Sequence, residues 1–489
     1  MVSVTLAAGY RRFTGDVLVR SAGAAGRCAK PLDWTRGADD RGLHHCSNHS
    51  QFLASIIVWP LHLLPVTTQI TSEGHLTVGG CDCVHLAGEF GTPLYVYDAM
   101  TLREQAKAYR RALAEAYPGL AEVAYASKAF LCPELARFWA VEGLGLDVVS
   151  EGELAIALAG GFPAVRIHFH GNNKTLAELA LALDAGVGRI VVDNLQELAL
   201  LERLAEERGR QQAIWLRLTP GVEVHTHAYR RTGHWASKFG LSAEDAWQAA
   251  RRAVRSPMLD LVGLHCHLGS QFFEPEPLRQ GVAFLLDFAA RLAGAFDWGL
   301  KELSPGGGWG VPYTPEDPPA PIERCVQSVV QAIVERCHEH HLPVPRLILE
   351  PGRSLIARAS VALYTVGSIK RAPDGTCYVA VDGGLADNPR PALYQARYMA
   401  FLANRADELA DTTVSVVGPY CESSDVLIRT ASLPAPKTGD LLAVPVSGAY
   451  QLSMASNYNG ALRPAAVLVE NGEARLLQRR ETLEDLLRK

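Results

Sequence analysis

The chain has 489 residues, which at about 100–200 residues per domain is enough for two to four domains. Hydrophobic residues make up 48% and charged residues 20%, a composition typical of soluble globular proteins. The formal net charge of −5 excludes the basic excess that nucleic-acid binding requires, so we expect no nucleic-acid partner. The ten cysteines form no Cys-x-x-Cys pair, which favours reduced thiols and a cytoplasmic location.

Residues 1–58 differ from the rest of the chain, because they show no sustained apolar period. Four side chains of metal-ligating type lie close together there: His44, His45, Cys46 and His49. Their spacing matches no standard zinc pattern, so we expect no metal. We interpret this segment as a disordered N-terminal extension.

An apolar stretch over residues 51–70 is the best candidate for a membrane segment. Pro60, His62 and Pro65 interrupt it, and its longest apolar run is far shorter than the roughly 18 residues that a membrane helix needs. We therefore expect no contact with a membrane.

Eight short apolar runs then alternate with amphipathic helical stretches. Strands that alternate with helices form parallel sheets, and eight such units within about 230 residues fit a (β/α)8 barrel of the TIM type. A doubly wound sheet usually has fewer strands, and no GxGxxG motif opens a first helix. The expected strands are residues 122–128, 144–150, 166–171, 189–194, 213–220, 261–269, 302–308 and 346–352.

After the eighth run, Val-rich segments are separated by Gly, Pro, Asn and Asp, which is typical of antiparallel strands. We therefore expect a barrel over residues 94–355. A C-terminal antiparallel β-sandwich or β-barrel domain would follow, formed by residues 59–93 and 356–489. Helices are expected over 99–116, ahead of the first barrel strand, and over 397–409, within the β domain.

Chemical groups in such barrels lie at the carboxyl ends of the strands. Gly306–Gly308 follow the seventh run, where barrels most often hold a phosphate against backbone N–H groups. Lys128 ends the first run, and a buried lysine is a nucleophilic amine. Glu350 ends the eighth run, where a carboxylate could keep a pyridine nitrogen protonated. A flexible turn or a salt-bridged lysine would explain each residue alone, but together they favour pyridoxal phosphate bound to Lys128 as a Schiff base.

His265 and His267 are two residues apart, so both point to one side of the sixth strand. Such a pair could bind a metal, as in metal-dependent amidohydrolases that share the barrel, and His225 and His227 repeat the spacing. Those enzymes carry the pair on the first strand and end the eighth in Asp, whereas here the eighth ends in Glu350. A cofactor ring stacked on His267 is the favoured interpretation, and we expect no metal.

Several motifs in one order are similar to those of the diaminopimelate decarboxylase family, the alanine-racemase-like, fold-type III pyridoxal-phosphate enzymes. The resemblance runs from about residue 60 to the C-terminus. The motifs are YASKAF (125–130), HTHAYRRTGHWASKFG (225–240), GLHCHLGSQ (263–271), SPGGGWG (304–310), EPGRSL (350–355), CESSD (421–425) and GAYQLSMASNYN (448–459).

The resemblance implies a role for each matching residue. Lys128 would hold the cofactor covalently, His267 would stack on its ring, and Glu350 would pair with the pyridine nitrogen. The remaining cofactor-binding positions would be Ser270, Gly306, Gly307, Gly308, Pro351, Gly352, Arg353 and Tyr450. Cys421 would donate a proton in the active site of the partner subunit, because the family forms head-to-tail homodimers with shared sites.

The substrate differs among related enzymes, some of which act on ornithine, lysine or arginine. The resemblance implies a clamp for the distal carboxylate of diaminopimelate at Arg353, Arg390 and Tyr394, with Glu422 on the distal ammonium and Tyr450 also contacting substrate. An enzyme for a substrate without that carboxylate would leave two arginines unpaired. The motif DGGLADNPRPALY departs from the family in its first half. A homologue that binds pyridoxal phosphate without turnover is the non-enzymatic alternative.

Overall fold

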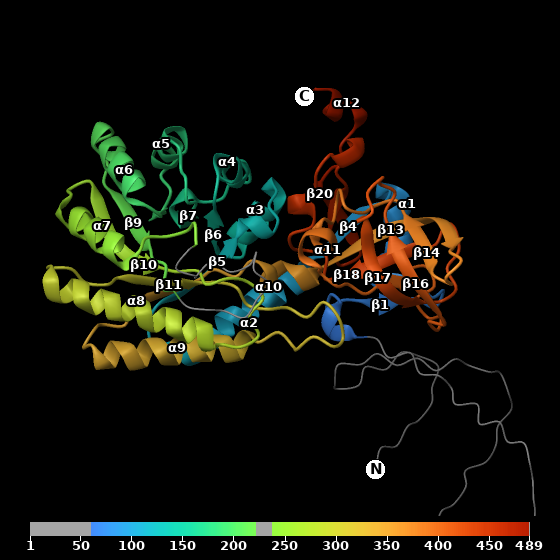
Figure 1. The fold of residues 1–489 in the computed structure, drawn as a ribbon, viewed down its shortest axis with the longest axis horizontal. Coiled ribbons are helices and arrows are strands. Elements are labelled where there is room, and N and C mark those ends of the chain that lie inside the picture. Colours follow the sequence, from blue (N-terminus) through green and yellow to red (C-terminus); the bar gives the residue numbers. More distant parts are fainter. Residues whose placement is uncertain (1–59, 222–236, 489) are drawn as a thin grey trace, which may run out of the picture.

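The computed structural model describes residues 60–221 and 237–488. The extension 1–58 and the histidines His225 and His227 lie outside these residues. The described chain forms a barrel surrounded by helices and, beside it, a second sheet (Figure 1). None of the helices within the two described ranges is long and apolar enough to cross a membrane.

Eight parallel strands close the barrel, in the order β10-β11-β12-β5-β6-β7-β8-β9. Every predicted run overlaps one of them, so the barrel prediction is confirmed. The strands are β5 (Ala121–Ala126), β6 (Gly145–Val148), β7 (Ile167–Phe169), β8 (Arg189–Val192), β9 (Gln212–Arg217), β10 (Leu259–His265), β11 (Glu302–Gly306) and β12 (Arg346–Leu349).

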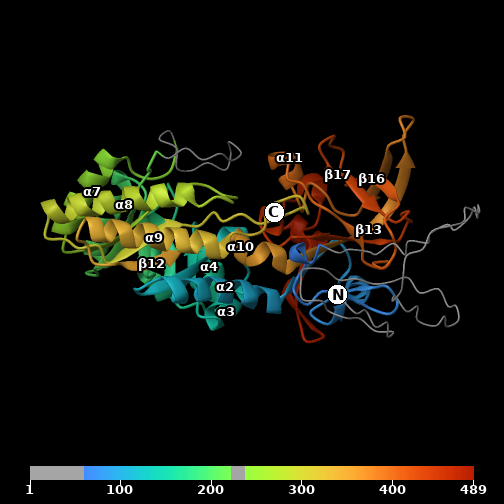
Figure 2. The ribbon, with the colours of Figure 1, turned by 90° about the horizontal axis from the view of Figure 1, so that it is seen from below.

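Helices cover the outside of the barrel (Figures 1 and 2). Most begin at a residue whose side chain accepts a backbone N–H, such as Ser150, Thr175, Asn194 and Ser242. The helices are α2 (Ala99–Ala116), as predicted, and α3 (Pro133–Val141), α4 (Glu151–Ala159), α5 (Leu176–Ala185), α6 (Leu195–Glu207), α7 (Ala243–Arg255), α8 (Glu276–Ala295) and α9 (Ile322–Glu339).

Alternation along each strand separates the two faces of the barrel wall. In β6, for example, Leu146 and Val148 belong to the apolar core shared with the helices, so Asp147 between them faces the interior. Ile167 and Phe169 of β7 likewise face the helices, which leaves His168 inside. The barrel interior therefore carries polar side chains at several levels.

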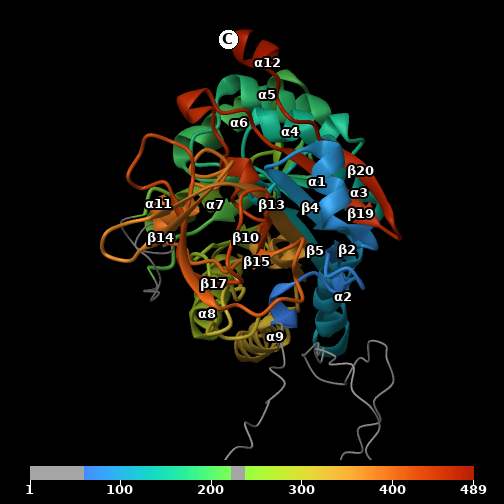
Figure 3. The same cartoon turned by 90° about the vertical axis from the view of Figure 1, so that its right-hand side faces the viewer.

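The second sheet is mostly antiparallel, with two parallel pairs, β4 with β19 and β14 with β16. It lies at the side of the barrel that Figure 3 turns toward the viewer. Its strands are β4 (Leu94–Asp98), β13 (Ser360–Arg371), β14 (Cys377–Val381), β15 (Phe401–Leu402), β16 (Thr412–Val417), β17 (Val426–Leu433), β18 (Leu441–Pro445), β19 (Ala465–Glu470) and β20 (Glu473–Gln478).

Two details of the predicted division need correction. The strand Leu94–Asp98, assigned to the barrel, pairs with β13 and β19 of the second sheet, because its buried aromatic and aliphatic residues fit between these two strands. The helix expected over 397–409 does not form, because Phe401–Leu402 pairs with β18 and the following residues turn. The short helix α11 (Arg390–Tyr394) precedes it.

A small N-terminal sheet packs on the second sheet. Leu76 and Val78 share an apolar cluster with Val96 and Leu363. This part comprises β1 (Gln69–Ile70), β2 (Leu76–Val78), β3 (Cys81–Asp82) and α1 (Cys83–Phe90). The remaining short helices are η1 (Leu61–Leu63), η2 (Ser127–Ala129), η3 (Ala164–Arg166), α10 (Arg353–Ile356), η5 (Ala357–Ala359), η6 (Leu452–Met454), η7 (Tyr458–Gly460) and α12 (Leu483–Leu487).

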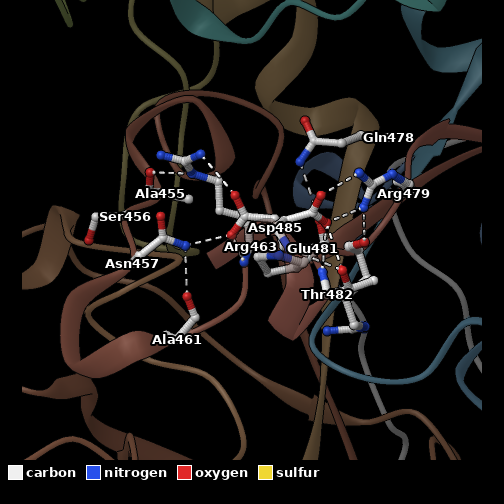
Figure 4. Close-up of polar contacts among 12 residues, drawn as sticks. Ala455, Ser456, Asn457, Ala461, Arg463, Gln478, Arg479, Glu481, Thr482 and Asp485 are labelled. Atoms are coloured by element: carbon white, nitrogen blue, oxygen red, sulfur yellow. Dashed lines mark hydrogen bonds and ion pairs between the residues drawn. The ribbon is translucent and has the colours of Figure 1, made fainter. Parts of the chain in front are cut away.

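A polar network fixes the segment that follows β18 to the C-terminal end of the chain (Figure 4). Glu481 accepts hydrogen bonds from Asn457 Nδ2 at 2.5 Å and from the backbone N–H and Nη1 of Arg463 at 2.9 and 3.0 Å. Arg463 Nε also donates to the carbonyl of Ala455 at 3.2 Å. These contacts hold the second half of the loop that begins near Tyr450.

Candidate active site

A cavity of about 340 Å³ opens at the carboxyl ends of the barrel strands. Tyr450, which follows β18 of the second sheet, forms part of its wall. Eight of the predicted site residues line the cavity: Lys128, His267, Ser270, Gly308, Glu350, Gly352, Arg353 and Tyr450. Closure of the barrel therefore brings residues that are distant in sequence into one site, as the position of active sites at strand ends predicts.

Lys128 lies in the short turn η2, directly after β5. The neighbouring residues Ser127 and Ala129 are buried, whereas Lys128 itself is exposed and lines the cavity. The carbonyl of Ala129 accepts a hydrogen bond from the backbone N–H of Tyr450 at 2.9 Å, which ties the lysine turn to the second domain. The amine of Lys128 is thus available to a molecule in the cavity.

Glu350 lies buried at the end of β12. Ser304 Oγ donates to its Oε1 at 2.7 Å, and Oε2 lies 3.0 Å from His265 Nε2. Burial, reinforced by the nearby charge of Asp147, raises the pKa of Glu350 to about 7. A positive group entering the cavity beside Glu350 would favour its charged form.

Asp147 is a second buried carboxylate in the interior. His168 Nδ1 lies 3.1 Å from Asp147 Oδ1, and His170 Nε2 lies 3.7 Å from the same oxygen. Burial opposes its charge, but the two histidines outweigh burial and hold the pKa of Asp147 below its usual value. The two acids therefore differ, because Asp147 stays charged where Glu350 retains a proton.

Gly306–Gly308 form a turn that only glycine can adopt. Gly306 and Gly308 have φ values of 76° and 108°. A Cβ on Gly307 would lie 2.1 Å from the Glu350 carbonyl oxygen, and one on Gly308 would lie 2.4 Å from that of Gly269. This turn passes close to two other strand ends beside the cavity, and a group with several acceptor oxygens, such as a phosphate, fits it.

His267 is partly buried on the cavity wall. The backbone N–H of Gly307 approaches its Nδ1 at 3.4 Å. Burial, together with the cations Lys128 and Arg217, holds the pKa of His267 well below its usual range. Its ring is therefore neutral, which suits stacking on an aromatic ligand.

A cluster of arginines and tyrosines adjoins the cavity. Arg353 donates to Tyr313 Oη at 2.7 Å and to Ser270 Oγ at 3.1 Å, and its guanidinium lies 4.6 Å from the Tyr450 ring centre. Buried Arg390 lies over the Tyr313 ring at 4.6 Å and donates to the Tyr398 hydroxyl. Burial raises the pKa of Tyr313, but the two arginines outweigh it and lower that pKa.

Seven predicted residues do not line this cavity. Arg390 is buried behind Tyr313, and Tyr394 lies partly exposed at the end of α11. Cys421 and Glu422 are exposed in the loop between β16 and β17. Gly307 and Pro351 are each next in sequence to a lining residue, and Gly306 precedes Gly307. One chain therefore brings together the cofactor-type residues but not Cys421 and Glu422.

Several site residues escaped the sequence prediction. His170 and Arg217 line the cavity at the ends of β7 and β9, within two predicted runs, so the strand-end rule could have found both. Tyr313 and Tyr398 lie in irregular segments, where no pattern marks them.

The metal interpretation can be compared with this geometry. Within the described residues, candidate ligand atoms of His170, His265 and Glu350 lie within 4.8 Å of one another. The predicted partner His267 is not part of this group. Burial, and after it the positive charge of Arg217, lowers the pKa of His265. The charge of Arg217 also disfavours a further cation at this place.

Known proteins are similar to this chain in both sequence and fold. The family model described as the pyridoxal binding domain of pyridoxal-dependent decarboxylases matches residues 100–357. A diaminopimelate decarboxylase of Bacillus subtilis is 48% identical over 425 residues, which cover 86% of this chain and 96% of that protein.

Solved structures agree with this assignment. The crystal structure of diaminopimelate decarboxylase from M. jannaschii matches with a TM-score of 0.80 at 34% identity, covering 87% of this chain and 97% of that one. Its complex with L-lysine matches with a TM-score of 0.79 at 35% identity, over 86% and 96% of the two chains. The present chain belongs to the diaminopimelate decarboxylase family of pyridoxal-dependent enzymes.

Proposed function

We propose that this chain decarboxylates meso-2,6-diaminopimelate to L-lysine and CO2, with pyridoxal phosphate in the cavity at the strand ends. The observation that carries the choice of substrate is the pair Arg353 and Arg390. Both are buried, and in the part of the chain that the structure describes their hydrogen-bond partners are hydroxyl groups rather than carboxylates. A substrate with a distal carboxylate supplies the missing negative charge.

The residues present fit pyridoxal phosphate. The glycine turn Gly306–Gly308, with Ser270, would hold the phosphate, and neutral His267 would stack on the ring. Pro351, Gly352 and Tyr450 would complete the binding site around Lys128. When bound, the cofactor supplies a conjugated ring that accepts the electron pair released as CO2 leaves.

Each remaining step belongs to side chains of the protein. The amine of Lys128 would hold the cofactor covalently. Glu350 would pair with the pyridine nitrogen, and its contacts with Ser304 and His265 fix its orientation. A cation at that nitrogen would favour the charged form of Glu350, so each would stabilise the other.

Substrate selection would depend on the opposite end of the substrate. Arg353 and Arg390 would bind its distal carboxylate together with Tyr394, and Glu422 would bind the distal ammonium. Tyr313 lies between the two arginines and holds their spacing. Removal of either arginine would weaken substrate binding, since a lost charged hydrogen bond costs roughly 1.5–3 kcal/mol.

Cys421 would deliver the proton that replaces the carboxylate on Cα. Its exposure in the β16–β17 loop supports a role in the cavity of a second subunit. We therefore propose a homodimer with shared active sites. The free cysteines among the described residues and the small-molecule chemistry support a cytoplasmic location.

The test is to incubate purified holoprotein with meso-diaminopimelate and, separately, with ornithine, lysine or arginine, and to measure CO2 and product. Diaminopimelate should be the preferred substrate. Arg353→Ala and Arg390→Ala should each lower kcat/KM by more than about tenfold. Arg429→Ala, at an exposed position of β17, is the matched control.

Circular dichroism and the cofactor absorbance must first show that both variants are folded and loaded. Wild-type kcat/KM in both arginine variants would show that the clamp is wrong. Faster turnover of lysine, ornithine or arginine would assign the chain to the sister activities. No CO2 from any of the four would favour a non-catalytic homologue.

A further inference from the structure

A second cavity, of about 480 Å³, lies at the opposite end of the barrel. Its wall includes the first residues of several strands, among them Glu122 of β5, Arg189 of β8, Glu302 of β11 and Arg346 of β12. Barrels usually fill this level with branched apolar side chains. Here this level of the barrel carries charged side chains, and core packing alone does not explain why they are there.

Two ion pairs already neutralise four of the charges there. Arg189 donates to both oxygens of Glu302, at 2.7 and 2.5 Å, and Trp215 Nε1 donates to Oε2 of the same carboxylate at 2.7 Å. Arg346 donates to Glu122 at 2.7 Å. These pairs leave the two glutamates no free charge for a further cation.

Arg110 and Arg166, in contrast, face the same cavity and donate only to backbone carbonyls within the described chain. Arg166 donates to the carbonyl of Ala140 at 2.9 Å, and Arg110 donates to that of Glu142. Both carbonyls belong to the end of α3. Four arginines against two glutamates give the cavity an excess of two positive charges, with His168 counted as neutral.

We propose that this lower cavity binds a small anion with two or more acidic groups, held by the guanidinium groups of Arg110 and Arg166. Guanidinium groups bind carboxylates and phosphates equally well. The expected ligand is therefore an anion that carries either kind of group. Such binding would not depend on which amino acid the upper cavity accepts.

A hydrogen bond joins the two cavities. His168 lines the lower one, Asp147 lines the upper one, and Nδ1 of the histidine lies 3.1 Å from the carboxylate. Burial opposes a charge on His168, but Asp147 outweighs burial and raises its pKa. A protonated His168 would add to the positive charge that an anion meets below.

The test is isothermal titration calorimetry of the holoenzyme with citrate and, in a second arm, with pyrophosphate, because the two arms distinguish carboxylates from phosphates. We expect one site for at least one probe in the wild type. The double variant Arg110→Gln/Arg166→Gln should weaken that binding by at least about tenfold. The control Arg111→Gln/Arg203→Gln removes the same charge from two exposed arginines that do not line the cavity.

A second variant tests the site without removing the two arginines, so a folding defect in the arginine variant cannot explain both results. Val165 lies at the cavity wall and is 72% exposed, so Val165→Glu adds a negative charge without disturbing the core. It should also weaken binding, whereas Leu176→Glu, at an exposed site outside the cavity, should not. Absence of binding by either probe overturns the proposal. Binding that survives in the Arg110/Arg166 variant and is displaced by L-lysine would place the anion in the upper cavity and overturn it as well.

Discussion

Burial gives the carboxyl group of Glu350 a pKa that differs from that of an exposed glutamate. Its pKa is raised from 4.5 to about 7 by burial and by the charge of Asp147. Between these two pH values the folded protein binds a proton that the unfolded chain releases. The stability from this group is therefore present below pH 4.5 and is lost as the pH rises toward 7.

The first prediction follows from this decrease of stability with rising pH. In cofactor-free protein, the free energy of unfolding of wild type should fall relative to Glu350→Gln by roughly 1–3 kcal/mol as the pH rises from 4.5 to 7. Urea unfolding at several pH values measures this difference. Glu335→Gln, on the exposed face of α9, should run parallel to wild type. A Glu350→Gln curve that also stays parallel would contradict the assignment.

The second prediction at the residue scale is that Lys128 holds the cofactor. Its position after β5, on the wall of the cavity, makes its amine the one expected to hold the cofactor. Borohydride reduction of the holoenzyme followed by peptide mapping should place the adduct on Lys128. Lys128→Ala should give no adduct and lose nearly all activity, whereas Lys301→Ala, an exposed lysine paired with Asp260, should behave as wild type. An adduct on another lysine would refute the role.

At the scale of elements, the turn after β11 should tolerate no side chain. A Cβ on Gly307 would collide with the backbone of Glu350 at 2.1 Å, and backbone cannot rotate away as a flexible side chain can. Gly307→Ala should therefore weaken pyridoxal phosphate binding by at least about tenfold, since 1.4 kcal/mol corresponds to that factor. Equilibrium dialysis against the cofactor measures it.

Gly294→Ala is the matched control for this variant, because a Cβ at that helix position of α8 meets nothing within 4 Å. It should retain wild-type affinity. Equal affinity of Gly307→Ala and wild type would show that the turn does not hold the phosphate.

The barrel strands were predictable because each alternates between two environments. Outward residues such as Leu146 and Val148 pack on helices, and inward residues such as Asp147 carry polar groups, so the runs are short, apolar and regularly spaced. The helix expected over 397–409 shows the limit of local propensity. There Phe401–Leu402 gains strand pairing with β18, and Ala403 donates to the Leu441 carbonyl.

The strand pattern predicts site residues that follow a barrel strand, and it does not predict those that lie elsewhere. Lys128 and Glu350 come at strand ends, so their meeting follows from barrel closure alone. Tyr313 and Tyr398 lie in irregular segments of different domains, and only the folded chain brings both to Arg390. The contact between them depends on how the domains dock, which no periodicity encodes.

At the scale of the whole molecule, one chain leaves its own active site without Cys421. The cysteine is exposed in the loop between β16 and β17 and does not line the cavity that holds Lys128. If a second copy supplies it, the enzyme should have no active monomer, and activity should depend on protein concentration below the dissociation constant of the dimer. Sedimentation and activity measured over one dilution series would show whether the two fall together.

The last prediction separates shared from unshared sites. A Lys128→Ala chain still supplies Cys421, and a Cys421→Ala chain still supplies Lys128, so each variant alone should be nearly inactive. After mixing and subunit exchange, half of random dimers are mixed and each contains one intact site of two. Activity should then recover to about a quarter of wild type. If mass spectrometry confirms exchange and activity stays at the level of the single variants, Lys128 and Cys421 act within one chain and the shared site is refuted.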